Sequence, residues 1–196
     1  MPPFSAHVPR SPSTGSPFEG SVWHGKWPKY RLIKKFERPG DKPRSFYCVF
    51  RGEITDEQYF CGPFGNIGEN GIDRKKKLEY SLSMKACSLP SRALAFQEII
   101  NSFTTLENTI REEYNISQFV RRHEDGSHVT LQLRVMDLVG RYRKLPVFNK
   151  DWTEPRRSQW EGRLLGADVD VCVRVFVQFG DRAIISTEIV YIRFLD

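Results

Sequence analysis

The sequence predicts an α+β fold, a single domain in which one long amphipathic helix packs on a twisted antiparallel sheet. Three observations predict this class: strand-like alternation before residue 90, a helical stripe of apolar residues after it, and further alternating segments up to residue 194. Alternating strand and helix units, which a doubly wound fold requires, are missing from the pattern. The 196 residues match the length of one domain.

The first strands follow from side-chain alternation. From residue 46, one face of a short strand alternates with the other: Phe46, Cys48 and Phe50 against Tyr47, Val49 and Arg51. Over residues 78–86, apolar side chains occupy every other position: Leu78, Tyr80, Leu82, Met84 and Ala86. A period of two is typical of a half-buried strand. The glycine-rich segment between the two strands lacks the order of a nucleotide-binding loop, so we expect an ordinary loop there.

A helix is predicted after Pro90, where Ser91 can cap its first turn. Its apolar residues recur at helical spacing: Phe96, Ile99, Ile100, Phe103, Leu106 and Ile110. The pattern indicates about five turns of amphipathic helix. Such a stripe could bind a partner, but packing on the domain's own sheet is the favoured interpretation.

The rest of the domain is predicted to consist of antiparallel strands. Residues 116–122 and 129–135 flank Asp125-Gly126, a pair that favours a hairpin turn. Residues 137–167 are less regular and contain two prolines, so we expect loops. Alternating valines at 169–177 and a segment at 183–194 predict a final hairpin.

The charge is unevenly distributed along the chain. Residues 1–50 hold nine of the 30 Lys and Arg and three of the 24 acids, so they carry the whole net charge of +6, while residues 51–196 hold 21 of each. The first 20 residues are rich in Pro, Ser and Gly, which predicts disorder. We therefore expect residues 1–45 to be a disordered Pro/Ser-rich tip and a basic aromatic arm, and residues 46–196 to be the α+β domain. Such an asymmetry indicates binding of an anionic polymer or surface.

The candidate binding residues are cations interleaved with tryptophan. Near a membrane each cation contributes on the order of 1 kcal/mol, and tryptophan either sits at headgroup level or stacks on bases. The candidates are Trp23, Lys26, Trp27, Lys29, Arg31, Lys34 and Lys35 in the arm and the cluster Arg74, Lys75, Lys76 and Lys77. The alternative is that the arm folds back on the domain and that the second cluster is merely solvated.

Catalysis is not indicated, and we expect neither a cofactor nor a metal. The catalytic sequence motifs for hydrolysis or deamination are missing, and the four cysteines form no C-x-x-C pair. His123 and His128 straddle the predicted turn and could approach each other, but no third ligand is suggested. An enzyme with a site assembled from scattered residues is the remaining alternative. We also expect neither a cleaved secretion signal nor a membrane-spanning segment.

The segment from Leu78 to Ile110, with its strand LEYSLSMKACS, turn LPSR and helix ALAFQEIINSFTTLE, resembles the core of rhabdovirus matrix proteins, especially those of vesiculoviruses. The resemblance continues through Pro155-Arg156-Arg157 and the strand ADVDVCVRVFVQF. It departs from the family at Pro2-Pro3-Phe4, where the Pro-Pro-x-Tyr budding motif would require tyrosine.

This resemblance implies a viral matrix protein, a structural protein of the virion. It would self-associate into homo-oligomers, bind and condense the nucleocapsid, and bridge it to an anionic membrane surface as a peripheral membrane protein during virus assembly and budding. The implied localisation is the virion, the host cytoplasm and the inner face of the host membrane, with the host nucleus as a further compartment. The alternative, from the basic aromatic arm alone, is a single-stranded nucleic-acid-binding protein such as a viral silencing suppressor or movement protein.

Overall fold

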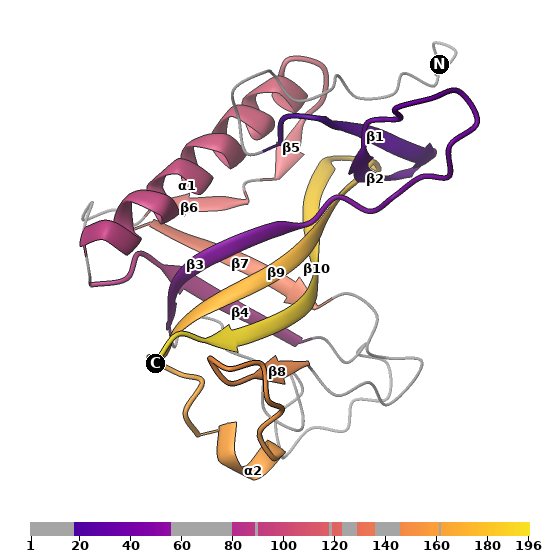
Figure 1. Cartoon of the computed structure of the whole chain (residues 1–196). Coiled ribbons are helices and arrows are strands. Elements are labelled where there is room, and N and C mark those ends of the chain that lie inside the picture. The colour runs from indigo at the N-terminus through magenta and orange to yellow at the C-terminus, as the bar shows by residue number, and fades with distance from the viewer. Residues whose placement is uncertain are drawn as a thin grey trace, which may run out of the picture.

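The computed structural model describes residues 18–55, 80–88, 90–117, 119–122, 129–135, 146–160 and 162–196. Within these residues, a single ten-stranded sheet is accompanied by two helices (Figure 1). The strands are β1 (Ser21–Lys26), β2 (Lys29–Lys34), β3 (Cys48–Thr55), β4 (Tyr80–Lys85), β5 (Ile116–Ser117), β6 (Val120–Arg122), β7 (Val129–Val135), β8 (Val147–Phe148), β9 (Asp168–Gln178) and β10 (Ala183–Phe194). The helices are α1 (Pro90–Arg111) and α2 (Arg157–Trp160).

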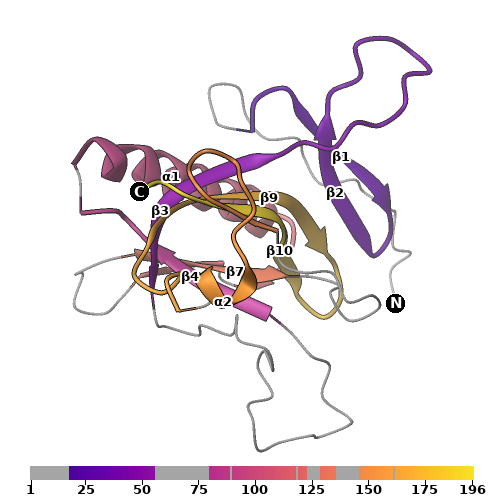
Figure 2. The same cartoon turned by 60° about the horizontal axis from the view of Figure 1, so that its bottom comes forward.

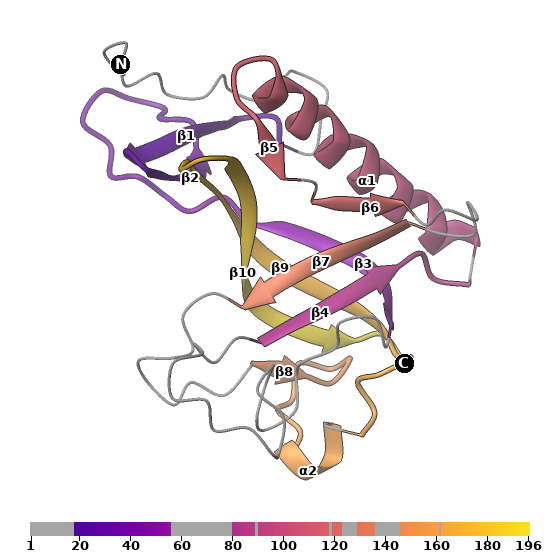
Figure 3. The same ribbon diagram turned by 180° about the vertical axis from the view of Figure 1, so that it is seen from behind.

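Five of these strands follow one another around a ring. β3 pairs antiparallel with β4 and β9, β4 pairs with β7, and β9 pairs with β10. β10 returns to β7, with Cα atoms of the two strands within 8 Å of each other, and Figure 3 shows them side by side. The ring order β3-β4-β7-β10-β9 corresponds to a small, partly open five-stranded barrel of the OB type.

β9 is the central strand of the fold because it pairs with β2, β3 and β10. Its alternate residues are buried valines that line the barrel interior: Val169, Val171, Val173, Val175 and Val177. β10 is bent, with a register shift between Ile189 and Tyr191. A bulge of this kind increases twist and lets one strand serve two partners, so β10 pairs with β5 near its start and with β8 near its end.

The expectation that a disordered basic arm precedes the sheet is wrong for the described residues 18–45. β1 and β2 form an antiparallel hairpin, and β2 extends the sheet by pairing with the last residues of β9. Trp23, Tyr30 and Leu32 are buried on the inner side of the hairpin. The basic residues alternate with them in sequence, so they lie on the outer side of two strands instead of along a solvated tether. The Pro/Ser-rich tip before residue 18 lies outside the described residues.

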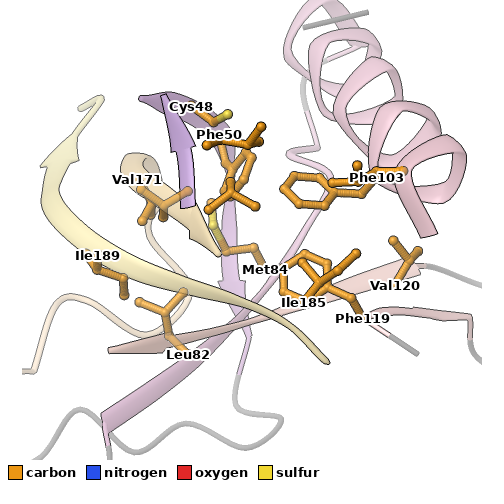
Figure 4. Packing of buried hydrophobic residues seen from close by; sticks show 14 of the residues in the cluster. Cys48, Phe50, Leu82, Met84, Phe103, Phe119, Val120, Val171, Ile185 and Ile189 are labelled. Atoms are coloured by element: carbon orange, nitrogen blue, oxygen red, sulfur yellow. The ribbon is translucent and has the colours of Figure 1, made fainter. Parts of the chain in front are cut away.

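The core fills the barrel interior and the space under α1. Phe103 of α1 points toward β3 and β6, where its ring centroid lies 5.4 Å from that of Phe50 and 4.8 Å from that of Phe119 (Figure 4). Phe18, just before β1, contacts the same ring edge-on at 5.0 Å. Each aromatic pair contributes about 0.5–1.5 kcal/mol beyond its buried area. Phe103 therefore anchors α1 to the residue before β1, to β3 and to the residue before β6.

Two features, one steric and one polar, set how α1 packs against the strands. Gly52 of β3 lies where an added Cβ would meet the Lys85 carbonyl oxygen at 2.6 Å and the Phe96 ring at 3.1 Å, so only glycine permits this approach. Glu107, which is 4% exposed, accepts hydrogen bonds from the backbone N–H groups of Phe119 and Val120. A buried carboxylate with two amide donors ties the end of α1 to the start of β6.

The predicted α+β class is wrong, since the described part of the chain is mainly β. The segment 137–167, expected to be loops, contributes β8 (Figure 1) and α2 (Figure 2) from its described residues. Together with β1 and β2, β8 enlarges the sheet, and the sheet curls into a partly open barrel. The main core therefore lies inside the curled sheet, and α1 is an accessory that contacts β3, β5 and β6, not the layer that buries an open sheet. Strand alternation cannot distinguish an open sheet from a closed one.

Candidate functional site

The outer surface of β9 is the most distinctive surface of the described structure. Residues that alternate with the buried valines point outward, and the pairing registers place outward residues of β2, β3 and β10 beside them. We call this surface the β9 face. It consists of Lys29, Arg31, Tyr47, Val49, Arg51, Asp170, Cys172, Arg174, Phe176, Glu188, Tyr191 and Arg193, with Phe148 and Trp152 at its β8 end.

In the half of the β9 face near the hairpin, cations lie over aromatic rings. The Lys29 ammonium is 4.8 Å from the Phe176 ring centroid, and the Arg174 guanidinium is 5.5 Å from that of Tyr47. Arg31 lies directly opposite Phe176 in the ladder. Tyr47 is 46% exposed and Phe176 half-buried, so both rings reach solvent. This half therefore presents ring surfaces that are bordered by positive charge.

Arg174 is held in place by its neighbours. Its Nη1 donates to the Glu188 carboxylate at 3.1 Å, and its Nη2 donates to the Tyr47 hydroxyl at 3.4 Å. The hydrogen bond from Arg174 lowers the pKa of the Tyr47 hydroxyl, outweighing partial burial. The guanidinium is thus oriented across the strands, with its plane near the tyrosine ring.

At the β8 end, two arginines converge on one carboxylate. Asp170 is 2% exposed and accepts from Arg51 Nε at 2.7 Å, Arg51 Nη2 at 3.0 Å and Arg193 Nη2 at 2.6 Å. Burial by itself raises the pKa of the Asp170 carboxyl, but the hydrogen bonds from Arg51 and Arg193 outweigh it and hold the pKa below its ordinary value. The cluster keeps a net positive charge because two guanidiniums share one carboxylate.

An aromatic group adjoins this cluster. The Arg193 guanidinium lies 4.5 Å from the Trp152 ring centroid. Tyr191 and Phe148 pack against the same indole, with ring centroids at 5.2 and 5.7 Å. Trp152 is nevertheless 49% exposed, so the β9 face ends on a large ring that is only partly covered.

A further ring pair lies at the turn of the β1–β2 hairpin. Trp27 stacks on Phe179, with ring centroids 5.2 Å apart and ring planes 16° from parallel. Tyr114 packs on Phe179 from another direction, at 4.6 Å. Trp27 keeps 45% of its surface exposed, so the hairpin turn and the β9–β10 turn together present an aromatic surface next to Lys26 and Lys29.

The structure separates the predicted site residues into groups. Trp23 is 5% exposed and belongs to the core, so it offers no ring to a ligand. Lys26, Lys29 and Arg31 lie along the hairpin beside β9, where Lys26 faces Lys29 across the ladder. Lys34 and Lys35 are exposed but lie beyond residues 29–31, the part of β2 that pairs with β9. Arg74, Lys75, Lys76 and Lys77 lie outside the described residues, in the segment that joins β3 to β4.

Sequence reasoning missed most of the β9 face. Tyr47, Arg51, Arg174 and Phe176 each follow the predicted strand alternation and could have been assigned to outward faces. Alternation within a strand does not tell which strands pair or in what register, so it could not show that β2, β3 and β10 lie beside β9. Trp152 carries no periodic signal, because it comes from an irregular segment.

The described residues contain no group of His, Cys, Asp or Glu side chains that could hold a metal ion. His123 and His128 lie outside them. Within the described part of the chain, neither helix combines the length and the apolar character that crossing a membrane requires. The charged and aromatic groups of the β9 face are cations, rings and two carboxylates.

Comparison with known proteins finds similarity at the level of fold. Neither a family model nor a curated protein matches the sequence. Two similar solved structures are both of a single-stranded DNA-binding protein from bacteriophage Enc34. A C-terminally truncated form has a TM-score of 0.50 at 14% identity, covering 83% of this chain and 95% of that one. A complex with ssDNA has a TM-score of 0.50 at 12% identity, covering 90% of this chain and 95% of that one.

These fold relatives correct one expectation. The similar folds belong to a phage single-stranded DNA-binding protein, which contradicts the expected description as a matrix protein acting in budding at a membrane. The resemblance to rhabdovirus matrix sequences, the lack of catalysis and the localisation are not tested by the fold and stay predictions.

Proposed function

We propose that the protein binds single-stranded nucleic acid, without catalysing a reaction on it, and that the β9 face is the binding surface. The observation that carries the proposal is the repeated placement of a cation against a reachable ring on one continuous surface: Lys29 with Phe176, Arg174 with Tyr47, and Arg193 with Trp152. Of the two functions that the sequence suggested, we therefore prefer binding of single-stranded nucleic acid to the role of a viral matrix protein.

The physical argument rests on what a single strand exposes. Its bases are unpaired and present π-faces, and its backbone carries one negative charge per nucleotide. Rings bind the bases by stacking, and flanking Lys and Arg bind the phosphates, so a surface that alternates the two suits a single strand of any sequence. A double helix hides its base faces, and the rings would then have no partner.

The charge balance of the β9 face agrees with this ligand. Lys29, Arg31, Arg51, Arg174 and Arg193 are set against only Asp170 and Glu188. Both carboxylates already hold arginines, so they orient cations more than they repel a phosphate. An anionic polymer is the ligand class that this balance selects.

The barrel type supports binding of an oligonucleotide, but it does not by itself select the β9 face. OB-type barrels bind oligonucleotides with their second and third strands, which correspond to β4 and β7 and lie outside the β9 face, and with the loops that follow the first and fourth strands. In this chain those loops are residues 56–79 and 179–182. The first contains the cluster Arg74–Lys77, and the second begins with Phe179, on which Trp27 stacks.

A fluorescence anisotropy titration with labelled oligo(dT) and oligo(rU), at several salt concentrations, tests the proposal. We expect tight binding to both single strands, weaker binding to a duplex of equal length, and affinity that falls with salt. Tyr47→Ala removes one ring and should weaken binding by about 5- to 100-fold, as expected for loss of one stacked base.

Lys29→Gln removes one charge from the β9 face and should lower the slope of log affinity against log salt by about 0.7. Arg111→Gln removes one charge from an exposed position in the last turn of α1 and serves as its matched control. Absence of single-strand binding by the unaltered protein, or equal effects of Lys29→Gln and Arg111→Gln, would overturn the proposal.

A further inference from the structure

We infer that Trp152, Arg51 and Arg193 form a nucleotide subsite at the β8 end of the β9 face, in which the indole stacks on one base and the two guanidiniums bind the adjoining phosphate. We call it the Trp152 subsite. The inference rests on the proposed function and adds a contact that the basic hairpin residues do not supply.

The backbone of Trp152 is held in an unfavourable conformation. Its φ is +68°, in the left-handed region that bulky residues rarely adopt. Two backbone hydrogen bonds of Asn149 hold the loop around Trp152. The Asn149 N–H donates to the Thr153 carbonyl at 2.8 Å, and the Asn149 carbonyl accepts from the Trp152 N–H at 3.0 Å. The Asp151 carboxylate accepts from the Thr153 hydroxyl at 2.6 Å. Backbone strain that is maintained by neighbouring hydrogen bonds is found most often at ligand-binding and active sites, so the conformation of Trp152 indicates a functional position.

The indole is supported but not enclosed. Arg193 lies 4.5 Å from its centroid, and Tyr191 meets it edge-on at 5.2 Å and 70°. Phe148 completes the support at 5.7 Å. These contacts fix the orientation of the ring, and 49% of the residue remains exposed. An indole fixed in this way can accept a base without a large loss of its own conformational freedom.

The arginines supply the phosphate contact. Asp170 binds both, yet the Arg51 side chain remains 43% exposed and that of Arg193 23%. A guanidinium has more N–H donors than one carboxylate oxygen pair can use, so each arginine can donate to a second anion while Asp170 fixes its position. A pair of oriented guanidiniums beside a stacking ring has the chemistry of a nucleotide site.

The competing explanation is that Trp152 only covers Arg193 and Tyr191 as a packing element. Intrinsic fluorescence separates the two explanations. The chain has four tryptophans: Trp23 and Trp160 are each 5% exposed, whereas Trp27 and Trp152 are 45% and 49% exposed. Only the last two can therefore stack on a base. Stacking of a base on an indole quenches its emission. Trp27→Phe isolates the response of Trp152, and Trp152→Phe isolates that of Trp27.

The probe is unlabelled oligo(dT), with labelled oligo(dT) anisotropy as an independent measure of binding. We expect Trp27→Phe to keep ligand-induced quenching and Trp152→Phe to lose most of it while binding within a few-fold of the unaltered protein. Trp152→Ala should weaken binding by about 5- to 100-fold. Arg51→Gln should lower the salt slope by about 0.7, relative to Arg111→Gln.

Circular dichroism and thermal unfolding verify that each variant is folded. If the unaltered protein binds oligo(dT) but Trp152→Ala binds equally well, or if Trp27→Phe shows binding without quenching, the Trp152 subsite is refuted and the proposed function stands. If the unaltered protein does not bind oligo(dT), both fall together.

Discussion

Replacing Asp170 by asparagine separates electrostatics from positioning, because the two make opposite predictions for binding. The change removes one negative charge from the β9 face, so attraction of a polyanion should increase if net charge alone decides. If Asp170 instead orients Arg51 and Arg193, binding should weaken, since a single amide oxygen cannot serve three N–H donors at 2.6–3.0 Å. We expect about 3- to 10-fold weaker binding of oligo(dT), in line with the loss of one oriented phosphate contact.

The effect on stability follows from the same contacts. A hydrogen bond to a charged group contributes about 1.5–3 kcal/mol. Asp170→Asn loses at least one of the three hydrogen bonds from Arg51 and Arg193, because the asparagine NH₂ group is a donor and would face a guanidinium N–H. Because the Arg51 side chain is 43% exposed, solvent screening reduces its share. We therefore expect a loss of about 2 kcal/mol in the free energy of unfolding, or about 4–8 °C in Tm.

The pH dependence supplies a second measure. The pKa of the Asp170 carboxyl is lowered in the folded state, so its stabilisation is fully present above the ordinary carboxyl pKa and is lost as pH falls through the folded value. The difference between the unaltered protein and Asp170→Asn, measured by urea unfolding, should be full at neutral pH and shrink as pH falls below the ordinary carboxyl pKa of about 3.9 and through the lower folded value. Asp181→Asn, at an exposed turn position, is the control and should change stability by less than about 0.5 kcal/mol. Tighter binding by Asp170→Asn, or a stability difference independent of pH, would refute the positioning role.

Two further predictions concern the fold. Gly52→Ala places a Cβ 2.6 Å from the Lys85 carbonyl oxygen and should cost about 1–3 kcal/mol in urea unfolding; an unchanged midpoint would show that the close approach is not needed. Glu107→Ala leaves the N–H groups of Phe119 and Val120 without their carboxylate acceptor and should cost about 2–4 kcal/mol, whereas Glu107→Gln keeps an acceptor oxygen and should cost less; equal losses would contradict the role of that oxygen.

Local alternation in the sequence was a sound guide to individual strands. The two alternating faces predicted for residues 46–51 are confirmed within β3, where Cys48 and Phe50 are buried and Val49 is 45% exposed; the strand itself begins at Cys48, two residues later than predicted. The final hairpin is confirmed by β9 and β10. These predictions succeed because the period of two is a property of each strand by itself and does not depend on its neighbours.

The β1–β2 hairpin shows where that guidance fails. Its outer positions carry Lys26, Lys29 and Arg31, and the density of charge suggested a solvated arm. Burial of Trp23 and Tyr30 depends on β9 being long enough to pair with β2 beyond the barrel, and the sequence of residues 21–34 holds no information about that partner.

The candidate site depends on the same long-range pairing. Lys29, Arg51 and Arg174 come from three strands that are far apart in the chain, and only the registers with β9 place their side chains on one face. Trp152 required in addition a left-handed backbone at a position where the sequence has no glycine. A periodic pattern in the sequence does not predict a left-handed backbone at a tryptophan.

The sequence by itself determined where several strands and the helix after Pro90 lie, and that its net charge is concentrated in the first quarter, because both follow from local residue properties. The tertiary structure alone decided that the sheet curls into a partly open barrel, that the basic segment is a hairpin of that sheet, and that rings and cations gather on the β9 face. The physical reason is that hydrogen-bond registers between distant strands set these relations, and a register is a property of two segments at once.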